Sequence, residues 1–81
     1  MPTVVMERVS EKPVSEEELE TMKKAAEVCF ELNDVKRLQT YLSADRTRFV
    51  CVCEARDAAA VRRALDSAAL PYDQVYPATS F

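Results

Sequence analysis

Four short stretches of the chain mix apolar and polar residues in the manner of strands, and two longer stretches repeat apolar residues at helical spacing. The strand-like stretches are rich in β-branched and aromatic residues and span Thr3–Val9, Val35–Leu42, Thr47–Glu54 and Gln74–Pro77. The helical stretches lie between them, and their apolar stripes contain Leu19, Met22, Ala26 and Cys29 in the first and Val61, Ala64, Leu65 and Ala68 in the second. The pattern predicts two helices and four strands.

Each predicted helix has a recognisable start. Ser15, with Glu18 three residues later, forms a capping box, and Asp57 is a favourable first cap for the second helix. The chain contains no glycine, so any left-handed turn residue has to be of another type. We expect Asn33 and Asp34 to supply this conformation after the first helix, with Asn33 as its cap, and Asp45 to supply it in the turn between the second and third strands.

The order strand–helix–strand–strand–helix–strand is that of a split βαβ unit. It predicts an α+β protein with a ferredoxin-like βαββαβ sandwich, in which residues 1–81 form one domain. Two helices would cover one face of a four-stranded antiparallel sheet.

We assign to the covered face Val4, Met6, Leu38, Leu42, Val50 and Val52. The uncovered face would then carry Glu7, Gln39, Tyr41, Phe49, Cys51, Cys53 and Tyr76. A mixed face of this kind usually meets another subunit, so we predict a homodimer through it.

Composition excludes several classes of function. The net charge is −3 and the 11 basic residues are dispersed, so neither nucleic acid nor an anionic membrane is an expected partner. No signal peptide is recognisable and no apolar run approaches about 20 residues, so we expect a cytoplasmic location. The absence of glycine excludes glycine-rich phosphate loops. The absence of histidine removes the commonest general base and the commonest ligand of transition metals.

The stretch RFVCVCEA carries two of the three cysteines, Cys51 and Cys53, on one side of a predicted strand. Their Cα atoms would be about 6.5–7 Å apart, near the upper limit for a disulfide. The two thiols can line a cleft, act as a catalytic or redox thiol, or donate to a metal ion. A metal ion would need further ligands, and Glu7 is the candidate on the same predicted face. Cys29 lies in a helix stripe and is expected to fill the core.

Five segments together resemble a known family. They are ER at 7–8, YLSAD at 41–45, CVCEA at 51–55, DAAAVRRA at 57–64 and LPYDQVYP at 70–77. In this order and spacing they resemble small bacterial ferredoxin-like proteins of unknown function, a group that includes an actinobacterial nickel-binding protein. The resemblance implies a ferredoxin-like fold, a homodimer and nickel as a candidate ligand. Many members have histidine where this chain has Gln39, an aromatic residue at Cys53, glycine at Arg46 and proline at Arg56. Amide oxygens are poor nickel ligands, so we expect no cofactor, with nickel or another transition metal as the alternative.

These observations favour a small cytoplasmic dimeric protein that binds a small molecule in a cleft lined by Glu7, Gln39, Tyr41, Cys51 and Cys53. A second interpretation is a cofactorless enzyme of the cyclase, isomerase or monooxygenase type. In that case Glu7 would be the base, Tyr41 a hydrogen-bond donor and Cys51 a nucleophile. A third is a pure protein-interaction module. The sequence leaves open whether the protein is an enzyme.

Overall fold

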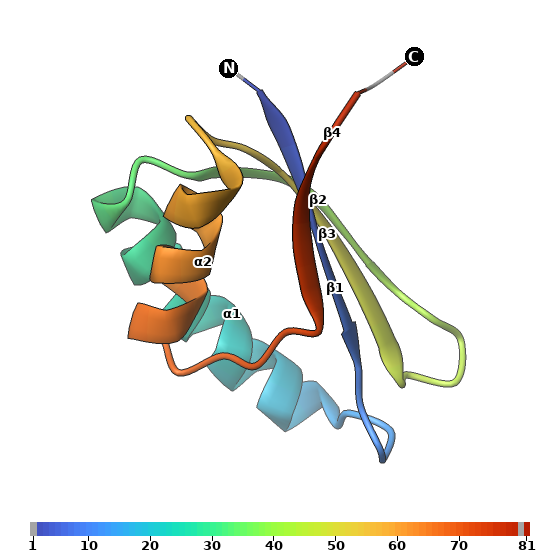
Figure 1. Ribbon diagram of the computed structural model, residues 1–81. Coiled ribbons are helices and arrows are strands. Elements are labelled where there is room, and N and C mark those ends of the chain that lie inside the picture. The colour runs from blue at the N-terminus through green and yellow to red at the C-terminus, as the bar shows by residue number, and fades with distance from the viewer. Residues whose placement is uncertain (1, 80) are drawn as a thin grey trace.

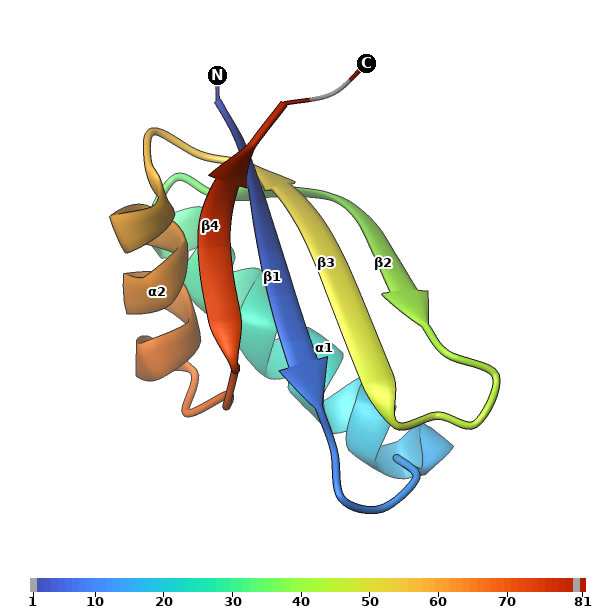
Figure 2. The same cartoon turned by 45° about the vertical axis from the view of Figure 1, so that its right-hand side comes forward.

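The computed structural model describes residues 2–79 and 81, and in this part of the chain the elements follow the predicted order. They are β1 (Thr3–Val9), α1 (Glu16–Leu32), β2 (Lys36–Leu42), β3 (Arg48–Glu54), α2 (Ala58–Ser67) and β4 (Gln74–Ala78). The strands form one antiparallel sheet in the order β2-β3-β1-β4. Both helices lie on the same face of this sheet (Figure 1), and the other face carries no helix (Figure 2). The predicted α+β ferredoxin-like architecture is confirmed.

Both predicted helix caps are present. The side chain of Ser15 accepts a hydrogen bond of 3.1 Å from the backbone N–H of Glu18. Asp57 Oδ1 accepts one of 2.8 Å from the N–H of Ala60 at the start of α2. These bonds satisfy amide donors that a helix start otherwise leaves unpaired, which is why the two helices begin where the sequence predicts.

Of the residues predicted for left-handed turns, Asp34 is confirmed, whereas Asn33 and Asp45 do not adopt this conformation. Asn33 has φ −103° and caps α1 differently, by donating from Nδ2 to the carbonyl oxygen of Cys29 at 2.8 Å. The positive φ values belong to Asp34 (57°), Arg46 (64°) and Ala69 (56°), whereas Asp45 does not adopt one. Within residues 2–79 and 81, three non-glycine residues are therefore held in a conformation that glycine adopts most easily.

The strand register reverses the predicted orientation of β3. Val4 pairs with Cys53 and Met6 pairs with Cys51, so both thiols share the helix-covered face with Val4 and Met6. Phe49 lies on the same covered face, opposite Arg8. Cys51, Cys53 and Phe49 were predicted on the uncovered face, and that prediction is wrong. The reason is that β3 is apolar on both sides, so alternation alone does not determine which side faces the helices.

The two valines of β3 are displaced in the same way. Val50 pairs with Glu7 and Val52 pairs with Val5, which places both valines on the uncovered face rather than the covered one. On β2 the register shifts between Arg37 and Gln39. This bulge turns Arg37 toward the helices, while Gln39 remains on the uncovered face as predicted.

The core is concentrated under α2. This helix buries Ala60, Val61, Ala64 and Leu65, whereas Phe30 is the one residue of α1 that is buried to the same degree. The sheet contributes Val4, Cys51, Cys53 and Val75 to the same cluster. The second helix therefore packs closely on the sheet, and the first helix leaves space beside it. Neither helix has the length and apolar character needed to cross a membrane, within the residues that the structure describes.

Candidate functional site

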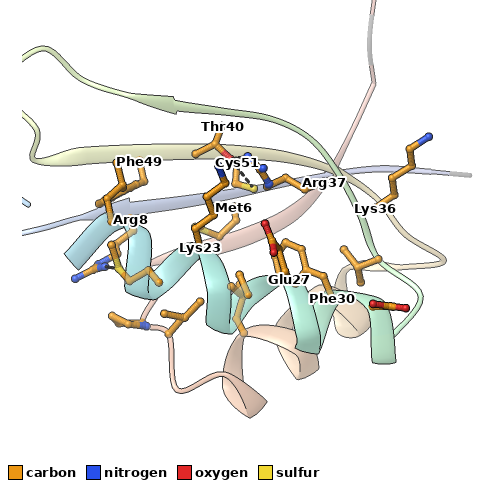
Figure 3. Close-up of a pocket in the computed structure, with 18 of the residues that line it drawn as sticks. Met6, Arg8, Lys23, Glu27, Phe30, Lys36, Arg37, Thr40, Phe49 and Cys51 are labelled. Atoms are coloured by element: carbon orange, nitrogen blue, oxygen red, sulfur yellow. Dashed lines mark hydrogen bonds between the residues drawn. The ribbon is translucent and has the colours of Figure 1, made fainter. Parts of the chain in front are cut away.

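A groove of about 800 Å³ lies between α1 and the helix-covered face of the sheet (Figure 3). Its apolar walls come from one side of α1 and from three strands, and include Leu19, Met22, Ala26, Phe30, Met6, Leu42 and Phe49. Small side chains explain the space, because Ala26 occupies the middle of the α1 stripe where a larger residue would reach the sheet. At one end the guanidinium of Arg8 lies over the Phe49 ring, 5.5 Å from its centroid.

Three polar side chains form a chain of contacts on the sheet side of the groove (Figure 3). Arg37 Nη1 donates to Thr40 Oγ1 at 3.0 Å, and Thr40 Oγ1 donates to Cys51 Sγ at 3.5 Å. Cys51 Sγ lies 3.6 Å from Cys53 Sγ. Cys51 lines the groove, while Cys53 is fully buried behind it. A guanidinium charge is thereby connected through a hydroxyl to a pair of thiols.

The pKa values of the two thiols are shifted in opposite directions. The thiol hydrogen bond from Cys53 lowers the pKa of Cys51 from 9.0 to about 7, with further lowering by the Thr40 hydroxyl and Arg37, and opposition from burial. The pKa of Cys53 is raised because its proton is held by Cys51 and because it is buried. As pH rises above about 7 the pair therefore goes over to a state with one proton and one negative charge, and the charge resides mainly on Cys51.

The structure divides the five residues of the predicted cleft between two faces of the sheet. Cys51 and Cys53 lie on the covered face, whereas Glu7, Gln39 and Tyr41 lie on the uncovered one. A single chain therefore does not bring them into one cleft. For the same reason Glu7 cannot join the two thiols as a metal ligand within one chain, so that predicted ligand set is wrong.

On the uncovered face Glu7 is hydrogen-bonded to Tyr76. The Tyr76 hydroxyl donates to Glu7 Oε2 at 2.5 Å, and this bond is the main cause that raises the pKa of Tyr76. Tyr41 is 59% exposed and is separated from Glu7 by Val50 of the intervening strand, a distance of about 10 Å from strand spacing. Tyr76, rather than Tyr41, is thus placed to act with Glu7.

The sequence prediction missed the groove and its polar residues Arg37 and Thr40. Strict alternation along β2 would place Arg37 on the same face as Gln39 and Tyr41, and no glycine or proline marks the bulge that turns it to the other face. The available signal for the groove was the alanine pair at positions 25–26 in an otherwise larger-residue stripe. Small residues at such positions leave room between a helix and a sheet.

These features define a ferredoxin-like α+β protein with a thiol-floored groove under its first helix. Residues 4–77 match a family model described as nickel responsive protein SCO4226-like, and the chain belongs to this family. The predicted family resemblance is confirmed. Among solved structures, SCO4226 from Streptomyces coelicolor A3(2) is similar, with a TM-score of 0.85, 15% identity and 98% of each chain covered. At that identity the likeness shows the shared fold. No curated protein matches the chain.

The nickel in the family description can be tested against the donors of this chain. Among residues 2–79 and 81, no group of three or more His, Cys, Asp and Glu side chains is placed to hold a metal ion. The chain has no histidine, and no carboxylate of the paired strands lies on the face of the two thiols. The acidic residues that line the groove with Cys51 come from α1 and the turn after it, and they do not form a metal-binding group with the thiols within the described residues. Nickel(II) is held by nitrogen and oxygen donors in square-planar or tetragonal sites. The donor set of one chain does not fit this ion.

Proposed function

We propose that the chain is a small cytoplasmic ligand-binding protein that holds a largely apolar organic molecule with one anionic group in the groove under α1. The observation that carries this proposal is the groove of about 800 Å³ with Arg37, Thr40 and Cys51 converging on one side. Small-molecule sites are typically concave, of about 300–1,000 Å³, and apolar with a few converging polar groups. Binding without chemical conversion is the function that these features support best.

The two parts of such a ligand have different neighbours. Its apolar body would lie between the α1 side chains Met22 and Phe30 and the sheet residue Phe49. Its anionic group would meet Arg37, whose guanidinium already polarises Thr40. Burial of the apolar body supplies affinity, and the guanidinium selects for an acid over a neutral analogue.

We further propose that two chains associate through the uncovered face of the sheet. Val5, Val50 and Val52 form the centre of this face and are only half-buried in one chain. Tyr41 is exposed at one side of these valines, and aromatic residues are enriched in protein interfaces. A dimer of this kind would enclose the Glu7–Tyr76 hydrogen bond between two sheets. It would also help to stabilise a domain of 81 residues, which is small for a single core.

The groove can be tested with 8-anilinonaphthalene-1-sulfonate, an apolar sulfonate whose fluorescence rises on binding. Ala26→Phe fills the groove, and Ala25→Phe makes the same change at the adjacent position, which does not line it. We expect wild type and Ala25→Phe to bind the dye with similar affinity, and Ala26→Phe to bind at least about tenfold more weakly, a change of about 1.4 kcal/mol.

Equal dye binding by the two variants would contradict the proposal. Circular dichroism and thermal unfolding check that both variants fold. If Ala26→Phe fails to fold, NMR shift changes in the wild type decide the question. Changes confined to α1, Thr40 and Cys51 support the groove, and changes confined to Val50 and Val52 overturn it.

A further inference from the structure

Sulfur atoms gather at the floor of the groove. Five methionine and cysteine residues fall within the part of the chain that the structure describes. Met6, Met22 and Cys51 line the groove, and Cys53 touches Cys51 from behind. Only Cys29 lies elsewhere among these five, packed against the core. Thiolates and thioethers are soft ligands, so this concentration of sulfur points to a soft metal ion.

Three of these sulfurs come from facing positions on β1 and β3. Cys51 and Cys53 lean together with their Sγ atoms 3.6 Å apart. Met6 is the direct cross-strand partner of Cys51, which places the two Cβ atoms about 4.5–5.5 Å apart on the same face (Figure 3). Met22 on α1 is already engaged, because Arg8 Nη1 lies 3.2 Å from its Sδ. Met6 is therefore the available thioether.

We infer that Cys51 and Cys53, with Met6 as third ligand, bind one copper(I) ion at the floor of the groove. With a metal–thiolate bond of about 2.3 Å, two thiolates on a three-coordinate ion are about 4.0 Å apart. The observed 3.6 Å differs from this by an amount that a small χ1 rotation supplies. Zinc normally takes four ligands and nickel(II) favours nitrogen and oxygen, so three sulfurs select copper(I) from this group.

Binding of the ion balances in protons and charge. Both thiols release their protons to solvent, so Cu⁺ held by two thiolates carries a net charge of −1. The hydrogen bond from Thr40 to Cys51 Sγ, supported by the hydrogen bond from Arg37 to Thr40, stabilises this charge.

The copper site and the proposed organic site share Cys51 and the groove-lining Met6. They differ at two other side chains. The metal would also need Cys53, which is fully buried and does not line the groove, whereas the organic molecule would need the space beside Ala26. Variants of Cys53 and Ala26 therefore separate the two proposals.

The test is an anaerobic titration of the reduced protein, prepared without a His-tag, with copper(I) in competition with the chelator bicinchoninate. Parallel titrations use nickel(II) and zinc(II). We expect one copper(I) per chain, bound more tightly than either divalent ion. Cys51→Ser and Cys53→Ser should each weaken copper(I) binding on the order of 100-fold or more, and Met6→Leu should weaken it about tenfold. Losses of about 10–100-fold in metal affinity are typical when a residue that supports a metal site is replaced. Cys29→Ser is the matched control and should bind within about twofold of wild type.

Binding that is lost equally in Cys29→Ser, or that is absent from the wild type, would overturn the copper site. If Cys53→Ser does not fold, X-ray absorption of the wild-type complex decides instead. A first shell of three sulfurs supports the inference, and a shell containing nitrogen or oxygen refutes it. Dye binding measured on Cys53→Ser separates the two proposals, because Cys53 does not line the groove. If this variant binds dye as the wild type does and its copper(I) affinity is also unchanged, the metal site alone is refuted.

Discussion

At the scale of single residues, the pKa of Cys51 is lowered by two side-chain hydrogen bonds and by one nearby positive charge. The thiol of Cys53 supplies the largest lowering of its pKa, the hydroxyl of Thr40 a smaller one, and Arg37 acts through its charge. Burial works against all three by penalising the thiolate. The outcome, a pKa lowered to about 7 in a residue that is only 4% exposed, favours the thiolate form of Cys51 over the thiol.

Alkylation by iodoacetamide in a Cys29→Ser background should therefore show a midpoint at about pH 7 rather than near 9.0. Thr40→Val should move this midpoint upward, and Cys53→Ala should move it further, in the order of their contributions. The rate is followed by mass spectrometry of the Cys51 peptide. A wild-type midpoint near 9.0 would show that the neighbours do not stabilise the thiolate.

The same pKa affects stability. Because the folded-state pKa of Cys51 lies below its value in the unfolded chain, its contribution grows as pH rises from about 7 toward 9 and is lost as pH falls through 7. The raised pKa of Cys53 acts in the opposite sense, and disfavours folding as pH rises beyond the ordinary thiol value of 9.0.

At the scale of elements, the capping residues and hydrophobic spacing predicted every helix and strand, but the orientation of β3 was predicted wrongly. Arg48–Glu54 carries apolar side chains on both sides, so alternation contains no information about which side meets the helices. The hairpin before it does contain that information. Leu42 was predicted on the covered face, and its pairing with Phe49 carries Cys51 and Cys53 to the same face. Cross-strand register is thus a better guide than alternation in a strand that is apolar on both sides.

The cap of α2 gives a prediction at this scale. Asp57→Ala removes the acceptor for the Ala60 N–H and should lower the free energy of unfolding by about 1 kcal/mol. Asp57→Asn keeps an acceptor of the same shape and should lower the free energy of unfolding by only a few tenths of about 1 kcal/mol. Urea unfolding of the two variants measures the difference. Equal losses in both would mean that the charge of Asp57, rather than its hydrogen bond, supports the helix.

At the scale of the whole molecule, the two helices pack against the sheet to different extents. α2 buries four residues against it, whereas α1 stands off and leaves the groove. The sheet therefore has one face with a groove and one face without any helix (Figure 2). The sequence predicted the uncovered face from the topology alone. It did not predict the groove, because the spacing between a helix and a sheet depends on the summed volumes of side chains from both, which no single stretch of sequence contains.

The proposed dimer leads to a prediction at this scale. Val50→Glu places a charge at the centre of the uncovered face and should raise the dimer dissociation constant by more than about tenfold, since a charge buried without a partner is costly. Val28→Glu makes the same change on the surface of α1, where Val28 is 60% exposed, and should leave association unchanged. Sedimentation velocity over a range of concentrations distinguishes the two. A wild-type chain that remains monomeric throughout would refute the dimer.

The three left-handed residues of this glycine-free chain have a consequence for how much change the protein can tolerate. Ala69 ends α2 with φ 56°, held by bonds from its own N–H to Asp66 and from Leu70 to Leu65. A non-glycine residue costs about 1–2 kcal/mol in this conformation. Ala69→Gly would remove part of this cost and raise the free energy of unfolding, without changing the groove or the thiols. Destabilising substitutions at buried positions such as Cys53 could then be made in the stabilised Ala69→Gly variant.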